Sequence, residues 1–315
     1  MIRGLESVGV ILLIFAVGFL FHYKKLWPEN APTSLSNVVI WISAPCLALT
    51  SIVGGYDRET LAGSLILILI GGIHLVLLML IGKGSSRLLG ITGGRRTIYE
   101  VTFTFSNVIF VGLPINQIVF GENGPPPLFA YYVVTLTCFW SFGVYQIAAA
   151  APGRHRQAGA KSAISLKKIL NPGLIGVMVA YGLVAAGLVL PLVLDKALGY
   201  LGNLTVPLSL LIIGANLTIF AKGFPRIARD EVFIMLAKFV ISPAVMFALL
   251  KLFGITGFPF YVFLLSSSMP CHMQTSILAQ HYEVEPAYAS KLVGLSTLLS
   301  IITIPCYVAL IHTMM

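Results

Sequence analysis

The sequence predicts an all-α polytopic membrane protein with ten transmembrane helices, and three observations support that fold class. Of the 315 residues, 57% are apolar and only 10% are charged, giving a mean hydropathy of +0.94. A soluble domain carries roughly 25% charged residues, which it needs to cover its surface. The apolar residues also occur in long blocks, and a helix needs roughly 20 of them to cross a bilayer. Finally, proline and amide residues interrupt two of these blocks near their centres.

The apolar blocks are expected to be helices, because a helix satisfies its own backbone donors and acceptors in lipid. They lack the short alternating pattern of an outer-membrane barrel. The first block, Leu5–His22, has the length of a secretory signal. No small-residue cleavage site precedes Lys24, so we interpret the block as a retained span. The first five predicted spans are residues 5–22, 37–53, 61–81, 98–120 and 128–149.

A polar linker, residues 152–168, follows the first five spans and is too short to form a domain. We expect it to be cytoplasmic. The five predicted spans after it are residues 169–190, 198–220, 232–253, 258–280 and 289–311. Residues 1–151 and 169–315 are therefore predicted to contain five spans each. Because five is an odd number, two copies of one five-span unit have opposite orientations in the membrane.

The two halves repeat each other weakly around their prolines. Pro45 in the second span precedes Pro114 in the fourth by 69 residues, and Pro207 in the seventh precedes Pro270 in the ninth by 63. Inverted repeats with interrupted helices at matching positions are typical of secondary transporters. The sequence therefore predicts two inverted five-helix repeats in which helices 4 and 9 are broken.

The charges in the loops predict the orientation. Fourteen Lys and Arg residues fall in the loops on one side of the predicted topology, and only Arg3, Arg58, Lys196 and Lys251 fall on the other. The more basic side is cytoplasmic by the positive-inside rule. We therefore expect a multi-pass protein of the plasma (inner) membrane with both termini extracytoplasmic. Because these charges set topology, the net charge of +9 does not indicate a nucleic-acid partner.

The four cysteines, Cys46, Cys138, Cys271 and Cys306, lie inside apolar blocks and form no CxxC pair. We interpret them as small buried hydrophobic residues rather than as disulfides or metal ligands. No metal and no cofactor is therefore expected.

The interrupted centres of spans four and nine form the predicted binding site. Proline removes a backbone donor and clashes with the carbonyl four residues back. Backbone freed at mid-membrane is tolerated only when it is buried in protein or lines a cavity. If both helices break there, two half-helix N-termini offer N–H groups and partial positive charge to a carboxylate. The alternative is a simple proline kink. The candidate substrate-binding residues are Asn107, Gly112, Pro114, Asn116, Met269, Pro270, His272 and Gln274.

Three ionisable residues inside spans are candidates for a charge or coupling role, because intramembrane charge is costly and functional by default. Lys238 in span eight is the strongest, as a charge that attracts an anion or responds to protons, and it equally suits snorkelling to an interface. Lys291, near the start of span ten, favours snorkelling. His74 is weaker, because a lone His in an apolar helix more often hydrogen-bonds within the packing. His272 follows the Pro270 break directly, so it suits an anion-binding or titrating role.

Several segments, taken together in order and spacing, resemble one family through most of the chain. They are Asn107 with Gly112-Leu113-Pro114, Phe120-Gly121-Glu122, Asn171-Pro172, Pro207-Leu208-Ser209-Leu210, Ile213-Gly214-Ala215, Met269-Pro270, Ile277-Leu278-Ala279 and Ser296-Thr297-Leu298-Leu299-Ser300. With these residues the chain resembles the auxin efflux carrier family. That family includes the plant PIN auxin exporters and bacterial carriers of malonate or malate.

The resemblance implies a fold similar to that of the bile-acid sodium symporters, with helices 4 and 9 crossing at their breaks. It implies a scaffold of spans 1, 2, 6 and 7, often a homodimer, and a transport domain of spans 3–5 and 8–10. It places Asn107, Pro114 and Pro270 at the crossover and substrate site. The implied function is secondary transport of a small organic anion, such as a carboxylate, by an elevator mechanism. The chain lacks the long cytoplasmic loop of plant PINs, so regulation through that loop is not implied.

Other functions stay open at this point. A sodium-coupled organic anion symporter has the same fold, but the centres of spans four and nine contain no Asp or Glu, which disfavours sodium. An intramembrane enzyme is not expected, because the six histidines are dispersed and no HExxH motif occurs. A non-transporting sensor or a channel is a further alternative. Auxin-like aromatics and dicarboxylates both suit helix N-termini, so the substrate, the direction and the coupling ion stay open.

Overall fold

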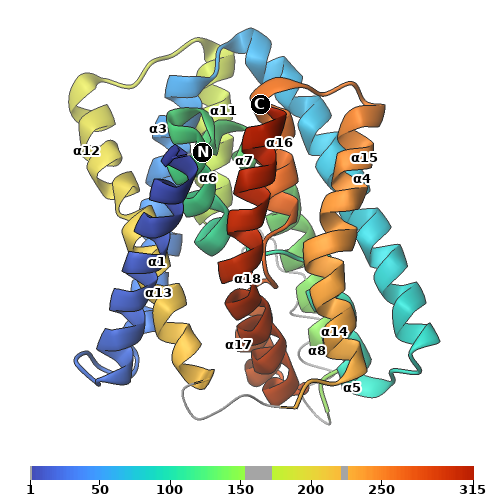
Figure 1. Cartoon of the computed structure of the whole chain (residues 1–315). Coiled ribbons are helices and arrows are strands. Elements are labelled where there is room, and N and C mark those ends of the chain that lie inside the picture. The colour runs from blue at the N-terminus through green and yellow to red at the C-terminus, as the bar shows by residue number, and fades with distance from the viewer. Residues whose placement is uncertain (1, 153–171, 221–225) are drawn as a thin grey trace.

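The computed structural model describes residues 2–152, 172–220 and 226–315, and these residues form an all-helical protein (Figure 1). The described residues contain no extended strand, and one isolated β-bridge joins Ser106 to Cys271. The predicted linker, residues 152–168, lies outside the described residues apart from Pro152. The predicted all-helical class is confirmed for the described chain.

The described part of each half of the chain consists mainly of helices. The N-terminal half consists of α1 (Ile2–Tyr23), α2 (Ala31–Val38), η1 (Val39–Ser43), α3 (Ala44–Gly55), α4 (Arg58–Leu88), α5 (Gly93–Thr104), η2 (Val108–Gly112), α6 (Leu113–Phe120), η3 (Gly121–Asn123), α7 (Pro125–Cys138), η4 (Phe139–Gly143) and α8 (Val144–Ala149). The C-terminal half consists of α11 (Pro172–Ala186), α12 (Leu192–Asn203), α13 (Thr205–Asn216), η5 (Leu217–Phe220), α14 (Arg229–Leu236), η6 (Ala237–Ile241), α15 (Ser242–Leu252), α16 (Gly257–Ser267), α17 (Gln274–His281) and α18 (Pro286–Met314).

Six helical stretches of the described chain are long and apolar enough, by length and composition, to cross a membrane. They are Ala31–Gly55, Arg58–Leu88, Pro125–Ala149, Leu192–Asn216, Arg229–Leu252 and Pro286–Met314. Shorter apolar helices also occur at Gly9–Tyr23, Val108–Phe120, Pro172–Ala186 and Gly257–Ser267. The chain therefore has the helices of a polytopic membrane protein, and most extend beyond the predicted spans by several residues.

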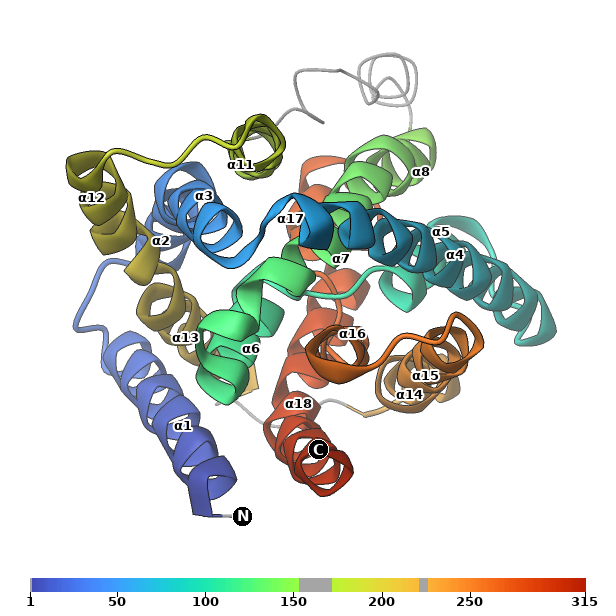
Figure 2. The same ribbon diagram turned by 90° about the horizontal axis from the view of Figure 1, so that it is seen from above.

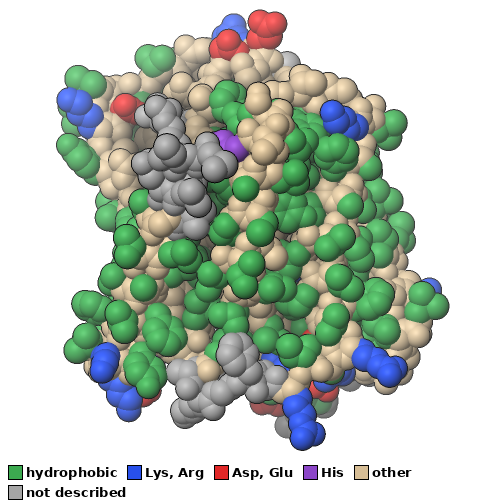
Figure 3. Space-filling view, viewed as in Figure 1, with side chains coloured by type: hydrophobic (Ala, Val, Ile, Leu, Met, Phe, Trp, Pro, Cys, Tyr) green, Lys and Arg blue, Asp and Glu red, His purple; other side chains and the backbone are tan. Residues whose placement is uncertain are grey.

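The surface of the molecule suits a lipid environment. Figure 3 shows apolar side chains over the middle of one face and charged side chains toward its upper and lower edges. Large exposed apolar side chains on the described helices include Leu13, Leu65, Leu80 and Ile302. A contiguous apolar surface of this kind marks a membrane or protein interface rather than a face in water.

A π-helical turn precedes three of the prolines that lie inside helices. The turns η1, η2 and η6 are each followed by a helix whose second residue is Pro45, Pro114 or Pro243. Proline clashes with the carbonyl four residues back, and the wider π turn gives that carbonyl room. For Pro243 this carbonyl belongs to Phe239, and the Tyr307 hydroxyl donates to it at 2.6 Å. These prolines therefore distort their helices without ending them.

Span four is interrupted, but the prediction of a break at Pro114 is wrong. The helix ends at Thr104, and residues 105–107 separate it from η2 and α6. Pro114 lies in the first turn of α6, where the preceding π turn accommodates its missing N–H. Span nine is interrupted around Pro270, between the end of α16 at Ser267 and the start of α17 at Gln274.

Seen from above, the helices fall into two groups (Figure 2). Helices α1, α2, α3, α12 and α13 lie on one side, α4, α5, α14 and α15 on the other, and α6 and α7 between them. Within the first side, helices meet backbone to backbone at glycine. A Cβ at Gly18 of α1 would overlap the backbone of Leu211 in α13, and a Cβ at Gly214 of α13 would overlap the backbone of Phe15 in α1. These two contacts join α1 to α13.

The same close packing joins α3 to α11 and α12. A Cβ at Gly176 would lie 2.9 Å from the backbone of Pro45, and a Cβ at Gly202 would lie 2.9 Å from the backbone of Leu47. Small residues let helices approach closely, and such contacts drive helix association in membranes, where burial of apolar surface contributes little. These helices therefore form one tightly packed unit.

Candidate functional site

The breaks in spans four and nine meet at the centre of the molecule. The Asn107 N–H donates to the Pro270 carbonyl at 2.8 Å, and the His272 N–H donates to the Phe105 carbonyl at 3.2 Å. Residues 105–107 and 270–272 thus pair as a two-bond antiparallel bridge. Backbone groups left by the broken helices would be costly in an apolar interior. The two breaks therefore satisfy each other, and we call this joint the crossover.

One helix turn supplies hydrogen-bond donors at the C-terminal ends of α5 and α16, the first half-helices of spans four and nine. The Lys238 ammonium donates to the Phe105 carbonyl at 2.9 Å and to Ser106 Oγ at 3.2 Å, just after α5 ends. Four residues further on, Ser242 Oγ donates to the Ser267 carbonyl at 2.7 Å, where α16 ends. Residues four apart lie on one face of a helix. A cation and a hydroxyl therefore face the two helix ends that carry partial negative charge.

The second half-helices begin at the crossover. The Phe110 N–H donates to Asn107 Oδ1 at 3.2 Å, so Asn107 caps η2 and the helix that follows it. On the other side, the Gln274 N–H donates to His272 Nδ1 at 3.3 Å at the start of α17. The remaining freed donor, the Cys271 N–H, is bound by Ser296 Oγ at 3.0 Å. Two helix N-termini, which favour negative charge, thus lie beside one another.

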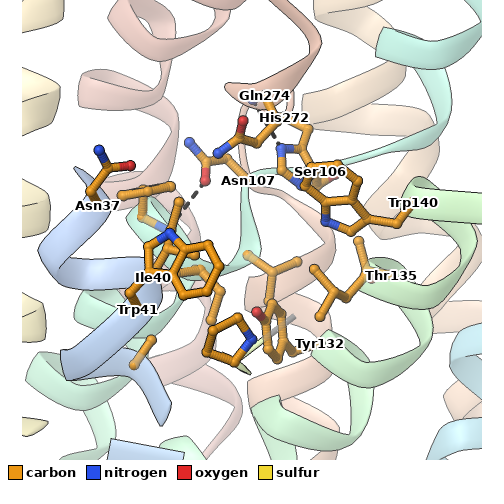
Figure 4. Close-up of a pocket in the computed structure, with 16 residues that line it drawn as sticks. Asn37, Ile40, Trp41, Ser106, Asn107, Tyr132, Thr135, Trp140, His272 and Gln274 are labelled. Carbon is orange, nitrogen blue, oxygen red and sulfur yellow. Dashed lines mark hydrogen bonds between the residues drawn. The ribbon is translucent and has the colours of Figure 1, made fainter. Parts of the chain in front are cut away.

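Two cavities flank these N-termini, one of about 360 Å³ and one of about 370 Å³. Both are lined by Asn37, Ile40, Asn107 and Gln274. The first is partly aromatic and is bounded by Trp41, Tyr132 and Trp140 with Ser106, Thr135 and His272 (Figure 4). The second is bounded by hydroxyl and amide side chains, which include Thr33, Ser36, Asn216, Ser276, Ser290 and Thr297. Among the described residues, no Lys, Arg, Asp or Glu lines either cavity.

Comparison with known proteins identifies the family. A family model described as "Membrane transport protein" matches residues 4–308, nearly the whole chain. The chain belongs to this family. The prediction of an auxin efflux carrier family member is therefore confirmed, and the chain is a membrane transporter rather than an enzyme.

Named relatives of the transporter agree with this. It is 25% identical over 309 residues to an "Uncharacterized transporter" of Methanothermobacter thermautotrophicus, which covers 96% of each chain. It is 22% identical over 318 residues to a "Putative malonate transporter" of Rhizobium meliloti, which covers 98% of this chain and 97% of the relative.

Of the eight predicted substrate-binding residues of the transporter, three line the cavities. Asn107 and Gln274 line both, and His272 lines the first. The half-buried ring of His272 stacks on Phe139, with 4.2 Å between ring centroids and 16° between planes. This stacking fixes the imidazole against η4 beside the crossover.

The other five residues line neither cavity. Pro270 contributes its carbonyl to the crossover. Met269 packs against Gly112, where an added Cβ would lie 3.4 Å from Met269 Cγ. Asn116 is fully buried, and its Nδ2 donates to the Gly112 carbonyl at 2.7 Å and to Ser266 Oγ at 3.2 Å. Pro114 is buried in α6. Asn116, Gly112 and Met269 thus connect span four to span nine.

The three predicted charge-bearing residues occupy different places. Lys238 is fully buried at the crossover, so the snorkelling alternative is wrong for it. His74 is also fully buried, with Nε2 at 3.0 Å from the Ser242 carbonyl and Nδ1 at 3.1 Å from the Tyr131 hydroxyl. Lys291 lies away from both breaks, where it pairs with Glu231 at 2.7 Å and donates to the Arg226 carbonyl at 2.6 Å.

Sequence reasoning missed several residues that line the cavities. The aromatic ones, Trp41, Tyr132 and Trp140, have no pattern that separates them from ordinary apolar residues of a span. Asn37 is different, because an amide at the start of an apolar block was a visible signal.

Proposed function

We propose that this transporter is a secondary carrier of a small organic anion, such as a carboxylate, held at the crossover. The observation that carries the proposal is the position of Asn107 and Gln274. Each stands at the N-terminal start of a second half-helix, and both line the same two cavities. Helix N-termini and amide donors suit an anion without any fixed cation in the cavity wall.

The magnitudes are adequate for a carrier, which must also release its substrate. A helix N-terminus stabilises a nearby anion by about 0.3–1 kcal/mol, and by up to about 2 kcal/mol when partly buried. A hydrogen bond to a charged group contributes roughly 1.5–3 kcal/mol. Two helix ends and two amides therefore support affinities in the micromolar to millimolar range, which correspond to about 4–8 kcal/mol.

The substrate class is supported by a relative as well as by the cavity. The Rhizobium meliloti protein named "Putative malonate transporter" spans the same length. We therefore take a small carboxylate as the first candidate. The aromatic wall of the first cavity, Trp41, Tyr132 and Trp140, also suits an apolar body attached to the carboxylate. Both classes belong in the test.

The proposed mechanism is an elevator-type alternating access. We divide the described helices into a scaffold group, α1–α3 and α11–α13, and a transport group, α4–α8 and α14–α18. The close glycine contacts at Gly18, Gly176, Gly202 and Gly214 all lie within the scaffold group. The crossover bonds all lie within the transport group. Two units that are each bound internally can slide past each other as rigid bodies.

One polar contact between the two groups is weak in kind. Asn216 Nδ2 approaches Met273 Sδ at 3.2 Å, and thioether sulfur is a weak acceptor. This division matches the scaffold of spans 1, 2, 6 and 7 in an arrangement of two inverted five-span repeats, which we also propose. Figure 1 has both chain ends in the upper half and the turns after α1 and α4 at the lower end. The basic residues of those turns support a cytoplasmic location for that lower end.

Sodium coupling is disfavoured by Lys238. Its ammonium already donates to a carbonyl and a hydroxyl at the crossover, the oxygens that a bound cation would use. We therefore expect transport that does not require sodium. Strict sodium dependence of uptake would contradict this part of the proposal.

Counterflow uptake into proteoliposomes tests the proposal. We expect the purified chain to exchange at least one of malonate, malate and indole-3-acetate in sodium-free buffer. Asn107→Ala should abolish that exchange, because it removes an amide donor and the cap of η2, which costs about 0.5–2 kcal/mol on its own. Asn203→Ala is the matched control, since Asn203 lines neither cavity. Unchanged exchange by a folded Asn107→Ala variant would overturn the crossover site.

A further inference from the structure

Three carboxamide side chains face the same two cavities, and they come from three different elements. Asn107 precedes η2, Gln274 begins α17, and Asn37 lies on α2 (Figure 4). Asn107 accepts a hydrogen bond through Oδ1 to cap η2, and no hydrogen bond among the described residues uses its Nδ2. None uses the side-chain amides of Asn37 or Gln274 either. All three therefore present donors to the cavity space.

Two polar neighbours of Asn37 in the scaffold group direct their donors elsewhere. Ser36 Oγ donates to the Pro32 carbonyl at 2.7 Å, within its own helix. Asn216 Nδ2 is directed to Met273 Sδ at 3.2 Å. Asn37 is therefore an amide that the scaffold group offers to both cavities, and its side chain is exposed toward them.

The three amides belong to two different bodies. Asn107 and Gln274 flank the backbone pairs of the crossover, so they keep a fixed relation to each other. Asn37 sits on the continuous stretch Ala31–Gly55, which is anchored where α3 packs against Gly176 and Gly202. A ligand bound by all three amides is therefore held across the boundary between the scaffold group and the transport group.

We propose that Asn37 is a substrate contact supplied by the scaffold group, present in the position of the transport group seen here and lost when that group moves. This inference rests on the proposed function. Asn107 and Gln274 travel with the substrate, whereas Asn37 holds it only at one end of the movement. Asn37 thereby raises affinity on one side of the membrane and must release the substrate before crossing.

Loss of the Asn37 contact is expected to affect KM and the maximal transport rate differently. A contact made in the bound ground state and broken before the crossing step raises affinity without helping that step. Its removal raises KM and does not lower the maximal rate. Removal of a contact that persists through the movement lowers the maximal rate. For one hydrogen bond to a charged acceptor, the expected change in KM is about tenfold.

The test is concentration-dependent counterflow of radiolabelled malonate, malate and indole-3-acetate into proteoliposomes. We expect Asn37→Ala to raise KM about tenfold at an unchanged or higher maximal rate per folded protein. Asn37→Gln, which keeps an amide, should restore much of the affinity. Asn107→Ala should abolish exchange, and Asn203→Ala should change neither quantity.

The outcomes separate this inference from the function on which it rests. If Asn107→Ala abolishes exchange while Asn37→Ala leaves KM unchanged, the scaffold contact is wrong and the crossover site stands. A lower maximal rate for Asn37→Ala at unchanged KM assigns Asn37 to helix packing and also overturns the inference. If the unmodified chain exchanges none of the three anions, or if Asn107→Ala has no effect, the proposed function fails and this inference fails with it.

Discussion

Lys238 shows how a buried charge can serve the fold rather than the ligand. Its ammonium is fully buried, and its partners at hydrogen-bond distance are the Phe105 carbonyl and Ser106 Oγ. No carboxylate of the described chain lies within 4.0 Å of it, since the ion pairs there are those of Arg95, Arg96 and Lys291. The charge is instead placed at the negative end of α5. Lys238 therefore stabilises the crossover without lining either cavity.

Replacing Lys238 is predicted to act on stability. Lys238→Met keeps the aliphatic stem but leaves the Phe105 carbonyl and Ser106 hydroxyl without this donor in a buried site, which costs roughly 1–3 kcal/mol. We expect a clear fall in the thermal unfolding temperature of the detergent-purified protein. Lys251→Met is the matched control, because Lys251 lies on the same helical stretch and is exposed. Normal stability with lost anion binding would instead make Lys238 a direct binding charge.

Helix packing in the scaffold group depends on single glycines. At Gly176 and Gly214 the neighbouring backbone occupies the space that a Cβ would need, whereas at Gly182, on the same helix as Gly176, nothing lies within 4 Å. Overpacking of this kind typically costs 1–3 kcal/mol, and backbone neighbours relieve it less readily than side chains. Elsewhere on a helix, Gly→Ala stabilises by about 0.5–1 kcal/mol.

This contrast gives a prediction for the helices. Gly176→Ala and Gly214→Ala should each lower the thermal unfolding temperature and the yield of monodisperse protein, while Gly182→Ala should leave both unchanged or higher. Fluorescence-detected size-exclusion chromatography over a temperature series measures both. Equal tolerance of all three substitutions would show that the scaffold group is not packed through these glycines.

The helices themselves were largely predictable, and the joints between them were not. Runs of apolar residues located the helical stretches, because span length and composition are local properties. The break in span four was misplaced, because Pro114 is the stronger local signal and the π turn η2 absorbs it. The actual break at residues 105–107 depends on pairing with residues 270–272, which lie far away in the sequence. No local pattern encodes that partner.

At the scale of the whole molecule, the two groups touch at a place suited to a reversible lock. A Cβ built on Gly55, in the scaffold group, lies 3.5 Å from the Cβ of Pro126, in the transport group. Disulfides join Cβ atoms that are about 3.5–4.5 Å apart. A disulfide at this pair would fix the relative position of the two groups.

The double variant Gly55→Cys with Pro126→Cys therefore tests the elevator movement. We expect oxidation to stop counterflow exchange and reduction to restore it, because sliding of one group past the other is required for each cycle. Each single cysteine variant is the control for the native cysteines and for the substitutions themselves. Undiminished exchange by fully oxidised, cross-linked protein would contradict movement at this boundary.

The candidate site was predictable in its chemistry and only partly in its residues. Asn107, His272 and Gln274 line the cavities because they stand directly at the breaks, which the sequence marked by polar residues in apolar spans. Gly112, Asn116 and Met269 were also expected at the site; they line neither cavity, and they connect the two broken spans. Which face of a broken helix meets a cavity is set by the surrounding helices. Asn37 of α2 likewise lines the cavities because of where its helix packs, opposite Asn107 and Gln274.

The joint between the broken helices is made mainly from main-chain atoms. Two N–H groups and two carbonyls of residues 105–107 and 270–272 hold it together. Main-chain groups are the same in every residue except proline, so most side chains at these positions can change while the joint persists. Side chains that touch the cargo can therefore change without removing this backbone pairing. One architecture can thereby serve carriers of chemically different anions that differ by a few point mutations.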